Sequence, residues 1–418
     1  MRPSLVLFFL LMSLQLLFSR AAALDEPSGV TAPASGSPVE SFFFGMHETN
    51  AAKHGWPSVR FGTLRIWDVY PHTNWRDLNT ARGVYDWTNL DNVVNLARSH
   101  GVDLVYTFGR TPAWASSHRA EAKMQDSIGA RYRPANQQYW KDFVIAISAR
   151  YAGKIKYWEL WNEPNAANFW AESPEQMVAM ARDAYPIIKS SDPGAMVLTP
   201  APQGSNAYKW MDMYLSAGGD AYADVVAFHG YLGSSNGVSN PPENIVTLIA
   251  HMKSVMSHHS QDSKELWDTE HSWGNDEHLT DQDQQAAWLA RHIILSWSGG
   301  VARSIWYCWD NDRFGTLWNK NADSITPAGI AYREVYNWLV GGTTGSPCSM
   351  ASDSTWKCSL TRPHGYIAEI VWNSLASTWY TPARKFTRYR DLNGNYFNVK
   401  GAIQIGSKPV LLENQDRQ

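Results

Sequence analysis

A glutamate with polar and aromatic neighbours follows a short apolar segment near the middle of the chain. Residues 161–165 read Trp-Asn-Glu-Pro-Asn and come directly after the apolar run 155–160. We expect that run to form a buried β-strand with Glu163 at its carboxyl end. A carboxylic acid placed there, beside the amide of Asn162 and the ring of Trp161, suits acid–base chemistry on a sugar bond. Such chemistry needs a second carboxyl group nearby.

Glu270 is the candidate for that second carboxyl group, because it ends another strand-like run, residues 266–270. Hydrolysis with retention of configuration uses two carboxyl groups about 5–5.5 Å apart, of which one must be ionised. Arg65 is a candidate cation and Tyr231 a candidate hydrogen-bond donor for an ionised Glu270. Asn162 is placed to bind the sugar 2-hydroxyl.

Two further acids lie on the same two runs. Side chains alternate between the faces of a strand, so we expect Asp268 to share a face with Glu270 and Glu159 to share one with Glu163. Both would then be buried acids one layer deeper in the fold. Such acids need a cation such as Arg65 or another donor.

Eight β-type runs alternate with helical patterns, which predicts a parallel sheet with helical crossovers. The runs cover residues 42–47, 61–67, 103–108, 155–161, 196–199, 225–229, 266–270 and 304–309. We predict an α/β fold, a closed (β/α)8 barrel of the TIM type over residues 41–342, with its active site at the carboxyl ends of the strands. An open, doubly wound sheet is the alternative, but no glycine-rich phosphate loop follows any run.

After residue 342 the pattern changes to short β-type runs separated by turns. We predict a small C-terminal antiparallel β domain over residues 343–418, and a sugar-binding module there is an open alternative. Cys348 and Cys358 are a candidate pair to close a hairpin by a disulfide. Cys308 lies in an apolar run and is expected to be a buried free thiol.

The N-terminal residues predict export. Arg2, the apolar stretch 5–18 and the alanines at 21–23 are typical of a signal peptide over residues 1–23. Residues 24–40, rich in Pro, Ser, Gly and Ala, are expected to be a flexible linker. We therefore expect a secreted protein, extracellular or periplasmic, with no membrane span after signal cleavage. An uncleaved membrane anchor is the alternative.

The amino-acid composition argues against a nucleic-acid partner and is compatible with a carbohydrate ligand. The net charge is −3 and no Lys/Arg-rich run occurs, so a nucleic-acid partner is not expected. The 21 Trp and 19 Tyr exceed ordinary usage; most of these rings can be core packing, but flat rings also stack on sugar faces. Trp309 is a candidate sugar platform and Trp114 a candidate for a further subsite. His47 and His229 either contact the sugar or orient their neighbours.

A metal hydrolase is disfavoured, because no His-Glu-x-x-His or similar spacing occurs among the 13 His. We expect no metal, no cofactor and a monomeric protein.

These motifs resemble those of clan A of the glycoside hydrolases. In that clan an Asn-Glu pair ending strand four carries the acid/base, and a Glu ending strand seven is the nucleophile. Residues 161–165 match the first motif and Thr269-Glu270 matches the second. His229-Gly230-Tyr231 resembles the clan's His-x-Tyr on strand six, whose Tyr hydrogen-bonds the nucleophile, and Arg65 matches its strand-two arginine.

Within the clan, residues 64–67 and 157–165 are most similar to family 39. That family includes β-xylosidases, α-L-iduronidases and bacterial exopolysaccharide hydrolases. The resemblance implies a retaining O-glycoside hydrolase with a polysaccharide or oligosaccharide substrate, and the chain length and loop aromatics favour endo action. The alternatives are an exo-acting, β-xylosidase-like or other glycosidase on oligosaccharides, a transglycosylase, and a non-catalytic carbohydrate-binding barrel.

Overall fold

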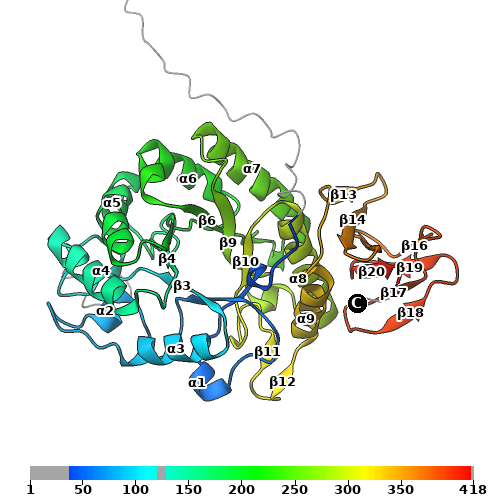
Figure 1. Ribbon diagram of the computed structural model, residues 1–418, viewed down its shortest axis with the longest axis horizontal. Helices are drawn as coiled ribbons and strands as arrows, with labels where there is room; N and C mark the ends of the chain where they lie inside the picture. The colour runs from blue at the N-terminus through cyan, green and yellow to red at the C-terminus, as the bar shows by residue number, and fades with distance from the viewer. Residues whose placement is uncertain (1–36, 120–128, 416–418) are drawn as a thin grey trace, which may run out of the picture.

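Eight parallel strands close into a barrel in the computed structural model, which describes residues 37–119 and 129–415 (Figure 1). Around the barrel the strand order is β1-β10-β9-β6-β5-β4-β3-β2. The strands are β1 (Phe44–Met46), β2 (Thr63–Ile66), β3 (Asp103–Thr107), β4 (Tyr157–Glu159), β5 (Met196–Leu198), β6 (Val225–His229), β9 (Glu265–His271) and β10 (Arg303–Trp306). The predicted (β/α)8 barrel is confirmed, and the doubly wound alternative is wrong.

Helices surround the barrel and cover its outer face (Figure 1). They are α1 (Ala51–His54), α2 (Trp75–Leu78), α3 (Thr88–Ser99), α4 (Gln137–Tyr151), α5 (Pro174–Ser191), α6 (Ala207–Ser216), α7 (Ile245–His258), α8 (Gln282–Ser298) and α9 (Pro327–Leu339). Short 3-10 turns occur at Ser41–Phe43, Gly129–Arg131, Gly219–Tyr222, Pro242–Asn244 and Asp276–His278. Over the described residues, no helix combines the length and the apolar character that a membrane crossing requires. The predicted signal peptide and most of the predicted linker lie outside the described residues.

Apolar side chains fill both sides of the barrel wall. One cluster includes Val105, Tyr157, Val225, Trp267 and Ile305, one residue from each of five strands. A much larger cluster joins the strands to the helices. Two short hairpins project from the loops: β7 (Ser234–Ser235) with β8 (Val238–Ser239), and β11 (Trp318–Asn319) with β12 (Ser324–Ile325). The packed barrel gives a rigid base for side chains at the strand ends.

Strand β9 carries a β-bulge close to its carboxyl end. Phe228 of β6 pairs with Asp268, but the next residue, His229, pairs with Glu270. Thr269 is therefore an extra residue on β9, and the register with β10 also shifts here. A bulge breaks the alternation of side chains and turns one of them toward the other face.

The C-terminal region forms antiparallel sheets that lie against α8 and α9, at the right of Figure 1. Its strands are β13 (Ser349–Met350), β14 (Thr355–Arg362), β15 (Tyr366–Asn373), β16 (Thr378–Tyr380), β17 (Arg388–Arg390), β18 (Tyr396–Asn398), β19 (Ile403–Ile405) and β20 (Val410–Glu413). Six of them form one sheet in the order β13-β14-β15-β20-β17-β18, and β16 pairs with β19.

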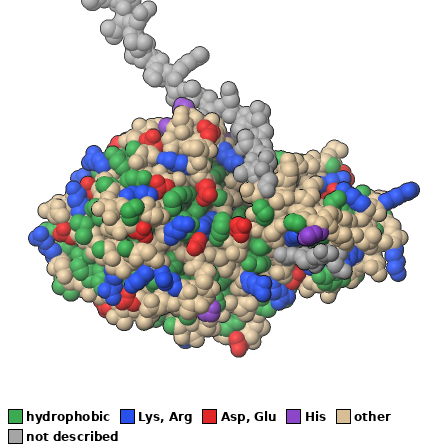
Figure 2. Space-filling model, viewed as in Figure 1, with side chains coloured by type: hydrophobic (Ala, Val, Ile, Leu, Met, Phe, Trp, Pro, Cys, Tyr) green, Lys and Arg blue, Asp and Glu red, His purple; other side chains and the backbone are tan. Residues whose placement is uncertain are grey.

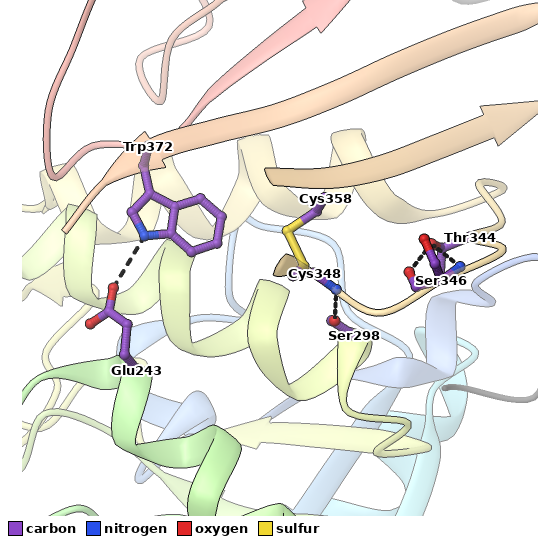
Figure 3. Close-up of a disulfide and its surroundings, with 7 residues drawn as sticks. All are labelled: Glu243, Ser298, Thr344, Ser346, Cys348, Cys358 and Trp372. Carbon is purple, nitrogen blue, oxygen red and sulfur yellow. Dashed lines mark hydrogen bonds between the residues drawn. A yellow bond between two sulfur atoms is a disulfide. The ribbon is translucent and has the colours of Figure 1, made fainter. Parts of the chain in front are cut away.

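A disulfide joins Cys348 to Cys358 and closes the β13–β14 hairpin, as predicted, while Cys308 is free and buried. Figure 3 shows two hydrogen bonds that attach this region to the barrel. The Cys348 N–H donates to Ser298 Oγ at the end of α8 (2.6 Å), and Trp372 Nε1 donates to Glu243 Oε1 (3.1 Å).

Candidate active site

Glu163 lies in the turn that follows β4, four residues beyond the strand's end at Glu159. A single bridge between Asn162 and Ala201 extends the pairing with the next strand, and the Glu163 N–H donates to Ala201 O (3.0 Å). The φ angle of Glu163 is 44°, in the left-handed region that side chains other than glycine rarely adopt. Strained backbone of this kind persists where the surrounding structure fixes it, most often at functional sites.

Arg65 of β2 is the centre of a buried ion network. Its Nε and Nη2 donate to Glu159 Oε2 (2.8 and 2.5 Å), and its Nη1 donates to Glu270 Oε2 (2.6 Å). Nη2 also donates to Asn162 Oδ1 (2.8 Å). One arginine therefore fixes groups from β4 and β9 relative to each other, and Glu159 is paired as the sequence predicted.

The bulge in β9 changes the environment of its acids. Thr269 Oγ1 donates to Glu159 Oε1 (2.6 Å), and the neighbouring Glu270 also reaches the Arg65 network. Asp268 instead accepts the backbone N–H of Gly230 (2.8 Å) and makes no bond with Arg65. The prediction that Asp268 shares a face with Glu270 is wrong, because the extra residue breaks the alternation.

The two candidate carboxyl groups face each other across the barrel mouth. One carboxylate oxygen of Glu163, one of Glu270 and a ring nitrogen of His229 all lie within 4.8 Å of one another. His229 Nδ1 is 2.9 Å from Glu163 Oε1, and the Tyr231 hydroxyl donates to Glu270 Oε1 (2.9 Å). The residues at the end of β6 thus contact both acids.

Burial has the same effect on the two acids, and their hydrogen bonds distinguish them. Burial raises the pKa of Glu163 to about 7, and burial also raises the pKa of Glu270 to about 7 against the lowering by His229 and Arg65. Carboxyl groups this close do not ionise independently, so the pair keeps one proton over a range of pH. Among the described residues, the side chain of Glu270 accepts hydrogen bonds from Arg65 and Tyr231. The side chain of Glu163 has one hydrogen-bond partner there, His229, whose own pKa burial lowers to about 4. The hydrogen bonds therefore favour the ionised form of Glu270 over that of Glu163.

Asp68 and Tyr307 are mouth residues that sequence reasoning did not assign. The Tyr307 hydroxyl donates to Asp68 Oδ2 (3.0 Å), and the charge of Asp68 raises the pKa of both Glu163 and Glu270. The position of Asp68, directly after the second strand's Arg-Ile-Trp, is a signal that could have identified it.

The remaining candidates lie at the mouth or in its loops. His47 is buried with Nε2 3.2 Å from Thr269 O, and burial holds its pKa well below the usual range. Trp309 is only 3% exposed and packs beside Trp318, so a sugar platform there stays a prediction. Trp114 lines a cavity of about 570 Å³ between the loops after β2 and β3, and its indole N–H donates to Asn79 O.

Three groups of residues in the described part of the chain bring possible metal-ligand atoms together. One is the Glu163–His229–Glu270 group itself, and a second, Asp212–His258–His259, lies at the surface. The third, Asp268–His271–His292, is fully buried, but the rings of its two histidines are stacked 4.3 Å apart at 16°. An ion binds in the plane of an imidazole ring, and two nearly parallel planes do not meet at a nearby point. We therefore assign no metal to that group.

Comparison with known proteins places this site in a family. A family model described as the glycosyl hydrolase catalytic core matches residues 83–332. The chain belongs to this glycosyl hydrolase family. A curated beta-xylosidase from Geobacillus stearothermophilus is 25% identical over 140 residues, which span 31% of this chain and 27% of the relative, so the match covers about a quarter of that protein.

Solved structures share the fold of this glycoside hydrolase. A family 39 glycoside hydrolase from Bacteroides cellulosilyticus WH2 superposes with a TM-score of 0.72 at 18% identity, over 89% of this chain and 81% of that one. A GH39 beta-xylosidase from Caulobacter crescentus gives 0.64 at 16% identity, over 91% and 97%. A GH30 endoxylanase from Clostridium papyrosolvens C71 gives 0.60 at 13% identity, over 92% and 99%. Together with the family match, they confirm the predicted resemblance to clan A and family 39.

Proposed function

We propose that this glycoside hydrolase cleaves its substrate with retention of configuration, with Glu163 as acid/base and Glu270 as nucleophile. The observation that carries the proposal is the approach of a carboxylate oxygen of Glu163 to one of Glu270 within 4.8 Å. Retaining enzymes hold the two groups about 5–5.5 Å apart, whereas inverting enzymes need about 6.5–9.5 Å to admit a water molecule. The different hydrogen bonding of the two acids supports the roles.

In the first step, the protonated Glu163 gives its proton to the glycosidic oxygen while an oxygen of Glu270 attacks the anomeric carbon. The bond to the leaving group breaks and a glycosyl ester of Glu270 forms. In the second step Glu163, now ionised, takes a proton from water as the water oxygen attacks the same carbon. Glu270 leaves as a carboxylate, stabilised by the donors Arg65 and Tyr231.

A polysaccharide cleaved in an endo manner is the proposed substrate. The cavity beside Trp114 supports this, because it lies on the carboxyl side of the strands and offers room for sugar units beyond the cleaved bond. The beta-xylosidase relative favours the second candidate, exo action on xylo-oligosaccharides. Export is part of the proposal and is supported by the Cys348–Cys358 disulfide, since disulfides persist in oxidising compartments.

The test begins with a screen of polysaccharides and aryl glycosides, in which chain-length analysis of the products separates endo from exo action. On the best substrate, Glu163→Gln and Glu270→Gln should each lose activity by at least ~100-fold. Glu334→Gln, a buried acid on α9, is the matched control. Proton NMR of the first sugar released should show the configuration of the substrate. Release of the opposite anomer, or full activity in both catalytic variants, would refute the mechanism.

A further inference from the structure

The buried residues Asp268, His271 and His292 lie directly behind the end of β6, and the mechanism above does not use them. Each has a buried polar atom that makes no well-aligned hydrogen bond: Asp268 Oδ2, His271 Nδ1 and His292 Nδ1, although the first two lie 3.1 Å apart. The stacked rings argue against an ion, so another reason is needed for placing three titratable side chains there. The hydrogen bonds of Asp268 and His292 both lead to one residue, Gly230, whereas His271 Nε2 lies 3.3 Å from Ser304 Oγ.

Gly230 is held at both its N–H and its C=O. Its N–H donates to Asp268 Oδ1 (2.8 Å) and also to the backbone oxygen of Glu270 (2.9 Å). His292 Nε2 is 3.3 Å from the Gly230 carbonyl oxygen. Since a carbonyl only accepts, His292 must carry its proton on Nε2 and donate it.

The residue at this position must be glycine. A Cβ atom added to Gly230 would lie 2.2 Å from Asp268 Oδ2, far inside contact distance. The close approach that lets Asp268 accept the Gly230 N–H therefore exists only for a residue without a side chain. This is a physical reason for glycine between His229 and Tyr231.

The neighbours of Gly230 in the chain touch the catalytic pair: His229 ends β6 and Tyr231 follows it. His229 Nδ1 lies 2.9 Å from Glu163, and the Tyr231 hydroxyl donates to Glu270. A shift of the Gly230 backbone would move both contacts together. We propose that Asp268 and His292 are positioning residues, which fix the two peptide groups on either side of the Gly230 Cα and so place His229 and Tyr231 on the two carboxyl groups.

The rest of the cluster fits this role. The His292 ring is stacked between His271 and Trp288, with centroid distances of 4.3 and 4.9 Å, which fixes its donor direction. His271 Nδ1 lies 3.1 Å from Asp268 Oδ2. Burial raises the pKa of Asp268 to about 7 and lowers those of both histidines to about 3, so near neutral pH both histidines are neutral. Asp268 acts as a hydrogen-bond acceptor, which an amide can replace.

The inference rests on the proposed roles of Glu163 and Glu270, and three variants test it. Asp268→Ala removes the acceptor, and His292→Phe keeps the ring stack but removes the donor. Asp268→Asn is the matched control, because its oxygen still accepts from Gly230. The probes are 4-nitrophenyl and 2,4-dinitrophenyl β-D-xylosides, with active sites counted by a 2-fluoro-xyloside inactivator.

We expect Asp268→Ala and His292→Phe to lower kcat per active site about 2- to 13-fold, the loss of one neutral hydrogen bond, with little change in KM. The loss should be greater for 4-nitrophenol, the poorer leaving group, because misplacing His229 weakens acid catalysis by Glu163. Asp268→Asn should stay within about two-fold of the wild type. A purely structural role would reduce the number of active sites and leave kcat per site unchanged, which would overturn the proposal. So would an Asp268→Asn variant as impaired as Asp268→Ala.

A crystal structure of His292→Phe gives a readout that does not depend on turnover. The proposal expects the His229–Glu163 and Tyr231–Glu270 contacts to lengthen from 2.9 Å. If both distances are unchanged, the positioning role is refuted. If the wild type hydrolyses no glycoside, the proposed function fails, and this structure still decides the positioning role.

Discussion

Removing the Tyr231 hydroxyl is the sharpest test of the assignment of Glu270, because that group makes one hydrogen bond, to Glu270 Oε1 at 2.9 Å. The bond is weakened when Glu270 becomes an ester and is restored as Glu270 leaves. A hydrogen bond to a charged group contributes about 1.5–3 kcal/mol. At about 1.36 kcal/mol per tenfold change in rate, Tyr231→Phe should lower kcat about 10- to 150-fold. The glycosyl-enzyme should accumulate, since its hydrolysis is the step that regenerates the carboxylate.

The same variant should change the pH profile. Tyr231 donates to the ionised form of Glu270, so its loss raises a pKa that burial has already raised to about 7. The acid limb of kcat/KM, which needs Glu270 ionised in the free enzyme, should move to higher pH. Tyr332→Phe is the control, because that buried hydroxyl donates to the backbone oxygen of Gly45. A Tyr231→Phe enzyme with kcat within two-fold of the wild type and an unmoved acid limb would refute the reasoning.

Three further changes test the site and the fold. Asp68→Asn removes a charge that raises the pKa of Glu163, so the alkaline limb of the pH–rate profile should move to lower pH, and an unmoved limb would exclude this coupling. Arg65→Met leaves two buried carboxylates without their cation and should lower the free energy of unfolding by about 3–5 kcal/mol in a urea titration, which a loss below about 1 kcal/mol would contradict. Replacing Cys348 and Cys358 together by serine should cost about 2–3 kcal/mol for a closed loop of this length, measured in the same way against the oxidised wild type.

Periodicity and motifs were enough to predict the barrel. All eight strands were found in order, and the runs leading to Glu163 and Glu270 supplied the two facing acids. The prediction failed where one residue interrupts a regular pattern. Asp268 was assigned to the wrong environment because the bulge at Thr269 depends on pairing with two neighbouring strands. The register in which a strand pairs with its neighbours cannot be predicted from the sequence of that strand alone.

Contacts between residues far apart in the sequence could not be predicted either. Asp68 and Tyr307 are 239 residues apart, and only barrel closure brings their side chains together. Likewise, the sequence predicts site roles for His229 and Tyr231, but it gives no reason for a glycine between them at position 230. The glycine is explained by the close approach of Asp268, which arises only when the strands pair in the folded chain.

Helix α8 has a consequence for how the whole chain unfolds. Every residue of this helix from Gln285 to Ser298 is buried, because the barrel lies on one side of it and the C-terminal sheets on another. Trp356 and Trp372 of those sheets belong to the same apolar cluster as the barrel helices. Separating the C-terminal region would therefore expose the helix that carries His292. We expect the barrel and the C-terminal sheets to unfold in a single cooperative transition. A chain that ends at residue 342 keeps every proposed catalytic residue, but we expect it to be poorly soluble because the apolar surface of α8 is exposed.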